Sequence, residues 1–451
     1  MLSITASVTN SSNNSVTWSL SGAGKLSNQT STSVTYNAPP TVTSNQNATV
    51  TATAAASSSS MATLSITVLA PGSTSNVQPI AVDGGPVANV IYQNGAFTTV
   101  TICEPGTSTC QAIPGILVDT GSVGLRVLQS ALTTIQLSPL TANGNTLNDC
   151  ISFVDGSFLW GTVAPADVKL AGEVAAGVSV HLVADPSFQI PSTCSNGGID
   201  EDNQAGLGAN GILGVGPEPF DCGFACDPNG GESSPPVPAY YACSSSGSCQ
   251  PTFVSCGPEC SDSAANQQVT NPVTLFTTDN NGVILNFQTV TSSEATLNGS
   301  MIFGIGTESN NALGSATVFT LDSNDNFTTD FNSTSLSGSF IDSGSNGYFF
   351  PDSSIPACSD NTSFYCPTML QNLSATNVGT NNAQSMVSFS IDNADNLLNN
   401  NPNDAVFPAL GGPLSGSFDW GLPFFYGRSV FTSIDGQTVP SGQPAAPWWA
   451  Y

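Results

Sequence analysis

Polar and apolar residues alternate in the first part of the chain, and turn residues break the alternation at short intervals. The alternating segments are residues 2–5, 16–20, 34–36, 50–53 and 64–68. Because successive side chains of a strand point to opposite faces, this pattern predicts short strands with one buried face. Several such strands separated by turns predict a small β-sandwich over residues 1–70, with Trp18 in its core.

Further along the chain, one pattern of an apolar run followed by a polar loop occurs twice. The two loops read Asp119-Thr120-Gly121-Ser122 and Asp342-Ser343-Gly344-Ser345. The apolar run before each aspartate predicts a buried strand, and the glycine permits a tight turn directly after it. Each aspartate is therefore expected at a strand end, in a loop that is supported from below.

If the two copies are related by an approximate twofold axis, the two carboxyl groups meet face to face. Two adjacent carboxyl groups in a partly dry cleft cannot both ionise easily, so they share one proton. One is then a base and the other an acid at the same pH, which suits the activation of a water molecule. Thr120 and Ser343 are predicted to brace the loops. Ser122 and Ser345 are predicted to donate to the outer carboxylate oxygens.

A single Asp-Thr-Gly sequence would indicate little more than a turn, because aspartate and glycine are ordinary turn residues. A second repeated feature supports the duplication. Apolar segments that contain glycine follow the two aspartates, at residues 210–216 and 420–427. A strand, an aspartate loop and a later buried strand with glycine thus form one lobe that the chain contains twice.

With these features the chain resembles the pepsin-like aspartic proteases over roughly residues 80–451. Besides the aspartate loops, the similar segments are residues 211–216, 299–304 and 421–435. Residues 124–127, 271–273 and 346–348 look more like an uncharacterised bacterial branch of secreted pepsin-like proteins. The resemblance implies an all-β, bilobal pepsin-like acid protease fold in which Asp119 and Asp342 are the catalytic aspartates.

The resemblance also implies a substrate and a flap. A peptide or protein substrate would lie extended in the interlobe cleft, and neither a metal nor an organic cofactor is needed. The hairpin that contains Phe153 and Trp160 matches the flap that closes over substrate. Phe153 stands where the family has a tyrosine, so one hydroxyl group near the water is missing. The alternative is that Phe153 and Trp160 are simple core aromatics.

These predictions divide the chain into parts. Residues 1–70 look like the immunoglobulin-like modules of bacterial surface proteins, and residues 71–78 form a linker rich in small residues. An N-terminal lobe is expected at residues 79–266, with a cysteine-rich insert at 217–266, and a C-terminal lobe at 267–451. A spacer role is favoured for the module. Binding to carbohydrate or to the cell wall, and thus cell-surface association through residues 1–70, is the alternative.

The charge of the chain restricts its partners. It contains 4 basic and 31 acidic residues, which gives a formal net charge of −27. Nucleic acid is excluded as a partner, since phosphate binding requires clustered lysine and arginine. Repulsion among carboxylates fades in acid, so we expect the protein to work at acidic pH. The sequence has no apolar run of eighteen residues, so no transmembrane segment is predicted.

The 12 cysteines indicate an oxidising compartment. Expected pairs are Cys103 with Cys110, Cys150 with Cys194 and Cys358 with Cys366, whereas the six from Cys222 to Cys260 stay open. A zinc site is the alternative, although the chain has 1 histidine. We expect a secreted or cell-surface protein, with Met1 in the place of a removed export signal.

Two single residues also have predicted roles. Arg126 lies in an apolar run and must be paired, with a backbone carbonyl or an aspartate as partner. His181, as the lone histidine, makes a Ser-His-Asp triad unattainable and is expected on an exposed strand.

The sequence therefore predicts a secreted aspartic endopeptidase. The alternative is a catalytically inactive binding or structural protein at the cell surface, built on the same scaffold.

Overall fold

The structure is a computed structural model, and it describes residues 2–9, 11–39, 46–68, 76–260 and 264–451. The chain divides into two compact units, Met1–Ser75 and Asn76–Tyr451. Residues 71–75 of the predicted linker lie outside the described residues. Residues 77 and 78, which were assigned to the same linker, belong instead to strand β7 of the second unit.

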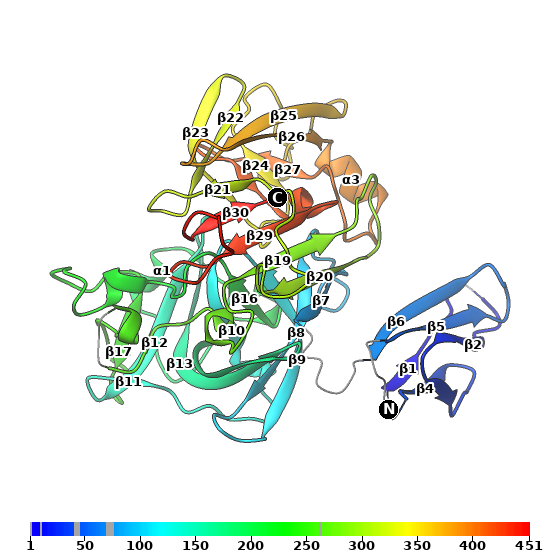
Figure 1. The fold of residues 1–451 in the computed structure, drawn as a ribbon, viewed down its shortest axis with the longest axis horizontal. Helices are drawn as coiled ribbons and strands as arrows, with labels where there is room; N and C mark the ends of the chain where they lie inside the picture. Colours follow the sequence, from blue (N-terminus) through cyan, green and yellow to red (C-terminus); the bar gives the residue numbers. More distant parts are fainter. Residues whose placement is uncertain (1, 10, 40–45, 69–75, 261–263) are drawn as a thin grey trace. The chain divides into compact units, whose positions relative to one another are not determined.

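The first unit contains two three-stranded sheets, of order β1-β4-β3 and β2-β5-β6 (Figure 1). Their strands are β1 Leu2–Thr5, β2 Val16–Gly22, β3 Lys25–Ser27, β4 Ser33–Asn37, β5 Gln46–Ala54 and β6 Met61–Val68. Val34 and Tyr36 of one sheet share a core with Val50 of the other, so the two sheets form two packed layers. Trp18 is only half-buried at the side of this core, where its indole N–H donates to the carbonyl of Thr30 (3.0 Å), so its prediction as a core residue needs correction.

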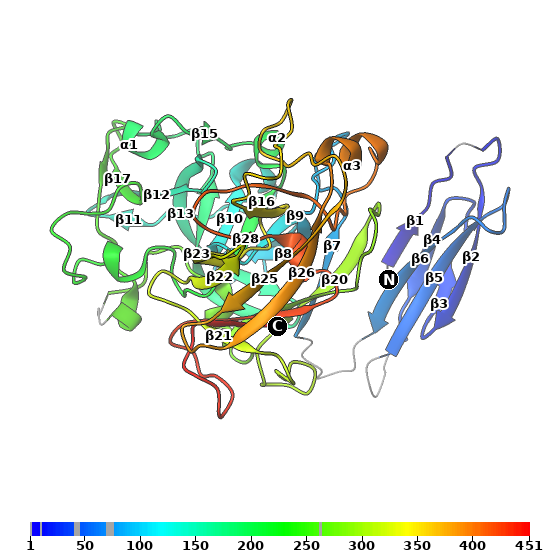
Figure 2. The same cartoon turned by 90° about the horizontal axis from the view of Figure 1, so that it is seen from above.

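The second unit is built almost entirely from strands, which confirms the predicted all-β fold class. A 17-stranded sheet runs through most of it, and a 7-stranded sheet of order β26-β25-β22-β23-β28-β24-β27 forms the rest. Figure 2 shows the unit from above. The strands of the large sheet are β7 Val77–Val82, β8 Ala96–Cys103, β9 Cys110–Asp119, β10 Val123–Leu128, β11 Thr141–Ala142, β12 Asn145–Ser152, β13 Ser157–Leu170, β14 Glu173–Val183, β15 Ile199–Asp200, β16 Gly211–Val215, β17 Tyr240–Cys243, β18 Cys249–Pro251, β19 Gly282–Phe287, β20 Leu297–Phe303, β21 Val318–Thr320, β29 Ser429–Ser433 and β30 Trp448–Ala450.

The remaining elements are the strands of the smaller sheet and short helices. These strands are β22 Phe327–Phe331, β23 Thr334–Ile341, β24 Tyr348–Phe350, β25 Gln371–Val378, β26 Gln384–Ile391, β27 Gly411–Pro413 and β28 Asp419–Trp420. The α-helices are α1 Ser192–Ser195, α2 Gln204–Leu207 and α3 Ala394–Asn400. The 3₁₀ turns are Gln129–Ala131, Gly223–Cys226, Gly257–Cys260, Pro272–Leu275 and Leu422–Phe425.

The duplicated sequence pattern corresponds to a duplicated strand arrangement. β9 leads to Asp119 and pairs in parallel with β16, so that Asp119 lies opposite Gly214. β23 leads to Asp342 and pairs in parallel with β28, with Ile341 opposite Trp420. Each aspartate strand therefore has a buried parallel neighbour that comes from much later in the chain.

Strand β7 connects the two halves of the second unit. It pairs antiparallel with β8 of the first half, and along its whole length with β20 of the second half. The first strand of the unit is thus shared by segments on both sides of residue 267. The aromatic end of the chain is also built into the sheet, because β30 pairs with β21 and β29.

All of the chain's cysteines are in disulfides. The three expected pairs are confirmed, and the other six cysteines pair with near neighbours, as Cys222–Cys226, Cys243–Cys249 and Cys256–Cys260. The alternative of a zinc site would need thiolates, which these oxidised residues do not offer.

Candidate active site

The two aspartate loops hold each other through four buried hydrogen bonds. The Thr120 hydroxyl donates to the Ile341 carbonyl (3.2 Å) and accepts from the backbone N–H of Ser343 (3.0 Å). In return, the Ser343 hydroxyl donates to the Val118 carbonyl (2.8 Å) and accepts from the Thr120 N–H (3.0 Å). Both side chains are fully buried. The loops are brought together from 223 residues apart, in the bracing role predicted for Thr120 and Ser343.

The carboxyl groups of the two loops have matching partners. Asp119 accepts from the N–H of Gly121 (2.8 Å) and from the Ser122 hydroxyl. Asp342 accepts from the N–H of Gly344 (2.7 Å) and from the Ser345 hydroxyl (2.9 Å). Each carboxyl is thus held in place by its own loop, through the predicted serine hydroxyl and a backbone N–H that was not predicted.

The glycine in each loop makes room for the opposite carboxyl group. A Cβ atom added to Gly121 would lie 2.5 Å from Cγ of Asp342, and one added to Gly344 would lie 2.7 Å from Oδ1 of Asp119. Both distances are far shorter than a normal contact. Any larger residue would therefore push the carboxyl groups away, and the closeness of the pair requires glycine in both places.

The electrostatics of the pair follow from this closeness. Asp119 is 6 % exposed, and Asp342 is partly exposed. Burial, the charge of Asp342 and a hydrogen bond between the two carboxyl groups raise the pKa of Asp119 well above its usual range. The arrangement favours one proton shared by the two carboxyl groups, so that the pair offers an acid and a base together.

Two residues beside the pair were not found from the sequence. Burial, and after it the charges of Glu201, Asp119 and Asp342, raise the pKa of the Tyr92 phenol. Asp419 in β28 is 5 % exposed, and burial followed by the charge of Asp342 raises its pKa well above the usual range. The sequence contains a signal for Asp419, because its segment can be aligned with residues 210–216. In that alignment Asp419 lies two residues before Gly421.

The loop before β8 connects the two halves near the site through Asn94. The amide nitrogen of Asn94 donates to the carbonyls of Asn346 (2.8 Å) and Phe407 (2.9 Å). Its amide oxygen accepts from the N–H of Phe407 (2.7 Å) and from the hydroxyl of Tyr426 (2.8 Å). Asn94 is fully buried, so these bonds fix the loop that carries Tyr92 against residues that follow Asp342.

The predicted flap is a hairpin of β12 and β13. Its turn is closed by Phe153, whose N–H donates to the Ser157 carbonyl (2.9 Å), and the Phe153 ring is partly buried. Phe153 and Tyr92 contact the same hydrophobic cluster, which contains Leu117 of the Asp119 strand.

Trp160 does not lie at the flap surface. It is 2 % exposed and packs edge-to-face on Tyr241, with ring centroids 5.4 Å apart. The prediction of a substrate contact for Trp160 is corrected to that of a core aromatic. Its position in β13 opposite Cys150 explains this, because Cys150 is joined to Cys194 inside the same cluster.

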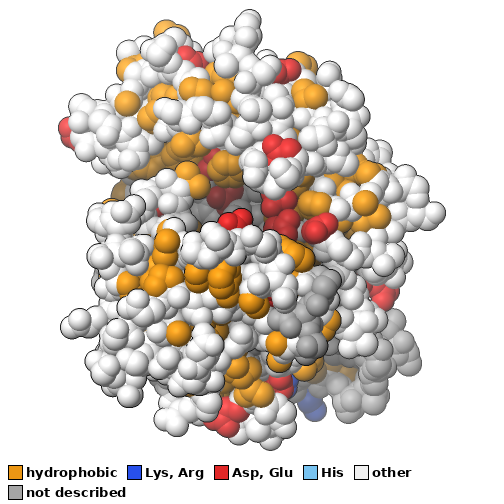
Figure 3. Space-filling model, turned by 90° about the vertical axis from the view of Figure 1, so that its left-hand side faces the viewer, with side chains coloured by type: hydrophobic (Ala, Val, Ile, Leu, Met, Phe, Trp, Pro, Cys, Tyr) orange, Lys and Arg blue, Asp and Glu red, His pale blue; other side chains and the backbone are white. Residues whose placement is uncertain are grey.

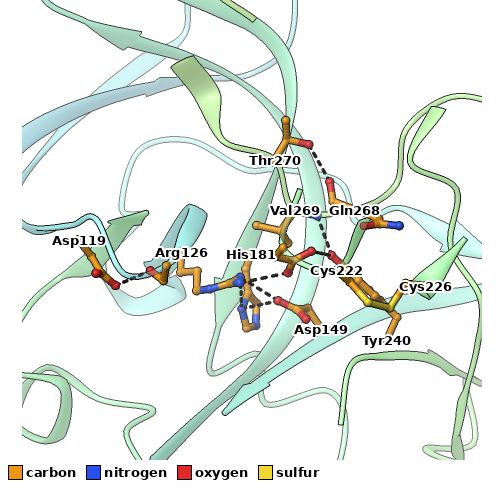
Figure 4. Close-up of polar contacts among 12 residues, drawn as sticks. Asp119, Arg126, Asp149, His181, Cys222, Cys226, Tyr240, Gln268, Val269 and Thr270 are labelled. Carbon is orange, nitrogen blue, oxygen red and sulfur yellow. Dashed lines mark hydrogen bonds and ion pairs between the residues drawn. A yellow bond between two sulfur atoms is a disulfide. The ribbon is translucent and has the colours of Figure 1, made fainter. Parts of the chain in front are cut away.

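Arg126 has the aspartate partners that its burial requires. Its guanidinium contacts Asp149 (2.9 Å) and Asp221 (3.0 Å), as Figure 4 shows for Asp149. Asp221 belongs to the cysteine-rich insert and also accepts from the Tyr240 hydroxyl (2.5 Å). The pairing predicted for Arg126 is confirmed, and it attaches the insert to the core of the unit.

His181 is fully buried in this cluster, so its prediction as an exposed residue is wrong. β14 lies between β10 and β13, which places His181 opposite Arg126 on one side and Val163 on the other. Its Nδ1 lies 3.1 Å from the Asp149 carboxylate. Burial of Asp149 alone would raise its pKa, but Arg126 and His181 together lower it.

The surface of the molecule is hollowed on one face. Figure 3 shows acidic side chains on the floor and rim of this hollow and hydrophobic side chains along its walls. Within the described ranges, no helix has the length and apolar character needed to cross a bilayer. Among the residues that the structure describes, two groups of side chains come close enough to hold a metal ion, but two members of each are disulfide-bonded cysteines.

The structure thus defines an all-β protein with two interlocked aspartate loops. A family model described as a protein of unknown function, DUF3443, matches residues 72–451, and the chain belongs to this family. No curated protein matches the chain. Among solved structures, it is similar to an aspartic proteinase from Irpex lacteus, with 16 % identity and a TM-score of 0.44, over 79 % of this chain and 93 % of that one. What the site can do is therefore judged from its own geometry.

Proposed function

We propose that this protein is an aspartic endopeptidase of pepsin-like architecture that hydrolyses peptide bonds with an activated water molecule. The observation that supports the proposal is the set of four buried hydrogen bonds that join the loops of Asp119 and Asp342. The hollow in Figure 3 would take the peptide in an extended form.

In the proposed reaction the Asp342 carboxylate removes a proton from water, and Asp119 donates its proton to the carbonyl oxygen of the substrate. The raised pKa of Asp119 supports this assignment of acid and base. Activity should be lost as the pH rises through the pKa of Asp119, so we propose an acidic working range. Disulfides and the large negative charge support export from the cell. The first unit would be an immunoglobulin-like module that acts as a spacer or attaches the enzyme to a surface.

The test is cleavage of casein from pH 3 to 8 by the full chain, with and without pepstatin. Pepstatin-sensitive cleavage that Asp119→Asn and Asp342→Asn each abolish would support the proposal. Asp360→Asn, at an exposed position of the loop closed by the Cys358–Cys366 disulfide, is the matched control and should cleave normally. Absence of cleavage by the unaltered chain at every pH would refute it.

The second candidate is a binding protein that has lost catalysis but kept the scaffold. One observation favours it, because Phe153 brings no hydroxyl group to the flap. In that case pepstatin or a peptide would still bind, as calorimetry would measure, while the unaltered chain would cleave nothing.

A further inference from the structure

Asp419 is a third carboxyl group beside the aspartate pair, and it belongs to neither duplicated loop. It lies in β28, which pairs in parallel with the strand that leads to Asp342. Its backbone is opposite Phe340, two residues before Asp342. The N–H of Asp342 donates to the carbonyl of Trp420, the residue after Asp419 (3.1 Å). β28 therefore supports the second aspartate loop directly.

The first lobe has an apolar residue at the position that matches Asp419. There, Leu117 lies two residues before Asp119, and it is opposite Ile212 of β16. Ile212 and Asp419 therefore occupy matching positions in the two lobes. Ile212 is 4 % exposed and belongs to a hydrophobic cluster. Since a buried carboxyl group is costly where an isoleucine would fit, the difference between the lobes requires a reason.

The surroundings of Asp419 contain negative groups and one hydroxyl. Asp342 and, more weakly, Asp119 are the charged groups that act on it. Among the described residues its Oδ1 atom is buried without a hydrogen-bond partner. Burial and the charge of Asp342 raise the pKa of Asp419, whereas hydrogen bonding to the Ser345 hydroxyl lowers it, and the same hydroxyl donates to Oδ2 of Asp342 (2.9 Å). A carboxylate with an unsatisfied oxygen next to another negative charge is unfavourable, whereas a neutral acid is compatible with this site.

We infer that Asp419 is a positioning residue for the aspartate pair, which as a neutral acid holds the Ser345 hydroxyl toward Asp342. The Asp419 O–H donates to Ser345, and the Ser345 O–H donates to Asp342, so that the two bonds strengthen each other. When Asp419 loses its proton, this donor disappears and a further negative charge arises beside the pair. The consequence for catalysis rests on the proposed function. The contact itself does not.

The protonation state of Asp419 can be tested without an assay of peptidase activity. A carboxyl group whose pKa is higher in the folded than in the unfolded state contributes to stability. This contribution is fully present below the unfolded-state pKa and is lost as the pH rises through the folded-state pKa. The thermal midpoint of Asp419→Asn should therefore exceed that of the unaltered chain above about pH 4, and the difference should vanish near pH 3. Asp279→Asn, at another buried aspartate, is the control for the effect of replacing a buried aspartate by asparagine. An equal pH dependence in the unaltered chain and Asp419→Asn would overturn the inference.

The positioning role is tested by the pH profile of kcat/KM on a peptide substrate. Asp419→Leu, which copies the apolar character of the first lobe, should lower kcat about tenfold or more through misplacement of Asp342. Asp419→Asn keeps a donor that cannot ionise, so it should lose less activity and extend the alkaline side of the profile. Wild-type kinetics and profile in Asp419→Leu would contradict the role.

Combination with Ser345→Ala separates this inference from the proposed function. If Asp419 acts through Ser345, then the shift in thermal midpoint caused by Asp419→Leu should be different when Ser345 is already alanine. Additive shifts would overturn the inference, whether or not the protein cleaves peptides. Absence of cleavage by the unaltered chain, with non-additive shifts, would refute the proposed function and leave the contact established.

Discussion

The interlocked loops give the sharpest prediction, which concerns the Thr120 hydroxyl. Thr120→Val removes this hydroxyl group and keeps the shape of the side chain. Two buried groups then lose their partner, namely the Ser343 N–H at 3.0 Å and the Ile341 carbonyl at 3.2 Å. Each unpaired buried group costs about 1–3 kcal/mol, so with two such groups the variant should lose about 2–6 kcal/mol of unfolding free energy.

The assay for this prediction is urea unfolding of the full chain, followed by tryptophan fluorescence. Thr120→Ser is the matched control, because it keeps the hydroxyl and loses one methyl group, at about 1 kcal/mol. We also expect Thr120→Val to lose peptidase activity at pH 4 while it is still folded, since the loops would no longer hold the carboxyl groups together. A Thr120→Val variant as stable as Thr120→Ser would refute the reasoning about the buried bonds.

Three further predictions concern the carboxyl groups. Gly121→Ala should abolish activity because its Cβ would lie 2.5 Å from Cγ of Asp342, whereas Gly338→Ala, with its nearest contact at 3.8 Å, should be tolerated; a casein assay on both tests this. Asp149→Asn should cost about 3–5 kcal/mol at pH 7, measured by urea unfolding, since it breaks a buried ion pair. Because the folded pKa of Asp149 is lowered, this cost should shrink as the pH falls below about 4. Asp119→Asn, although inactive, should melt at a higher temperature than the unaltered chain above about pH 4, because its folded pKa is raised.

The features that could be predicted from the sequence are those written locally. An apolar run followed by Asp-Thr-Gly-Ser predicts a strand, a turn and the polar donors after it. The second copy at Asp342 predicts that the two aspartates lie together. The close disulfides are of the same kind, because Cys103 and Cys110 flank a short hairpin. In each case the residues that decide the structure lie within a few positions of one another.

The features that were missed depend on strand register over long distances. His181 is buried because β14 lies between β10 and β13. Nothing near His181 in the sequence indicates that β14 has a neighbouring strand on both sides. Trp160 looked like a flap residue, but the strand pairing turns it toward Cys150 and the core. Asn94 bonds to residues more than 250 positions away, and an asparagine in a loop gives no sign of such partners.

The contacts of Asn94 also bear on how the pair of aspartates stays together. The four bonds between the two aspartate loops, two of which join Thr120 directly to Ser343, hold the loops together at their base. Asn94 adds a second attachment, since it fixes the loop of the first half to Asn346, four residues after Asp342. These bonds add to the pairing of β7 with β8 and with β20, which also joins the two halves. The loop that carries Tyr92 and Asn94 therefore contributes to the site from outside both aspartate loops, through the charge interactions of Tyr92 with the pair and the bonds of Asn94.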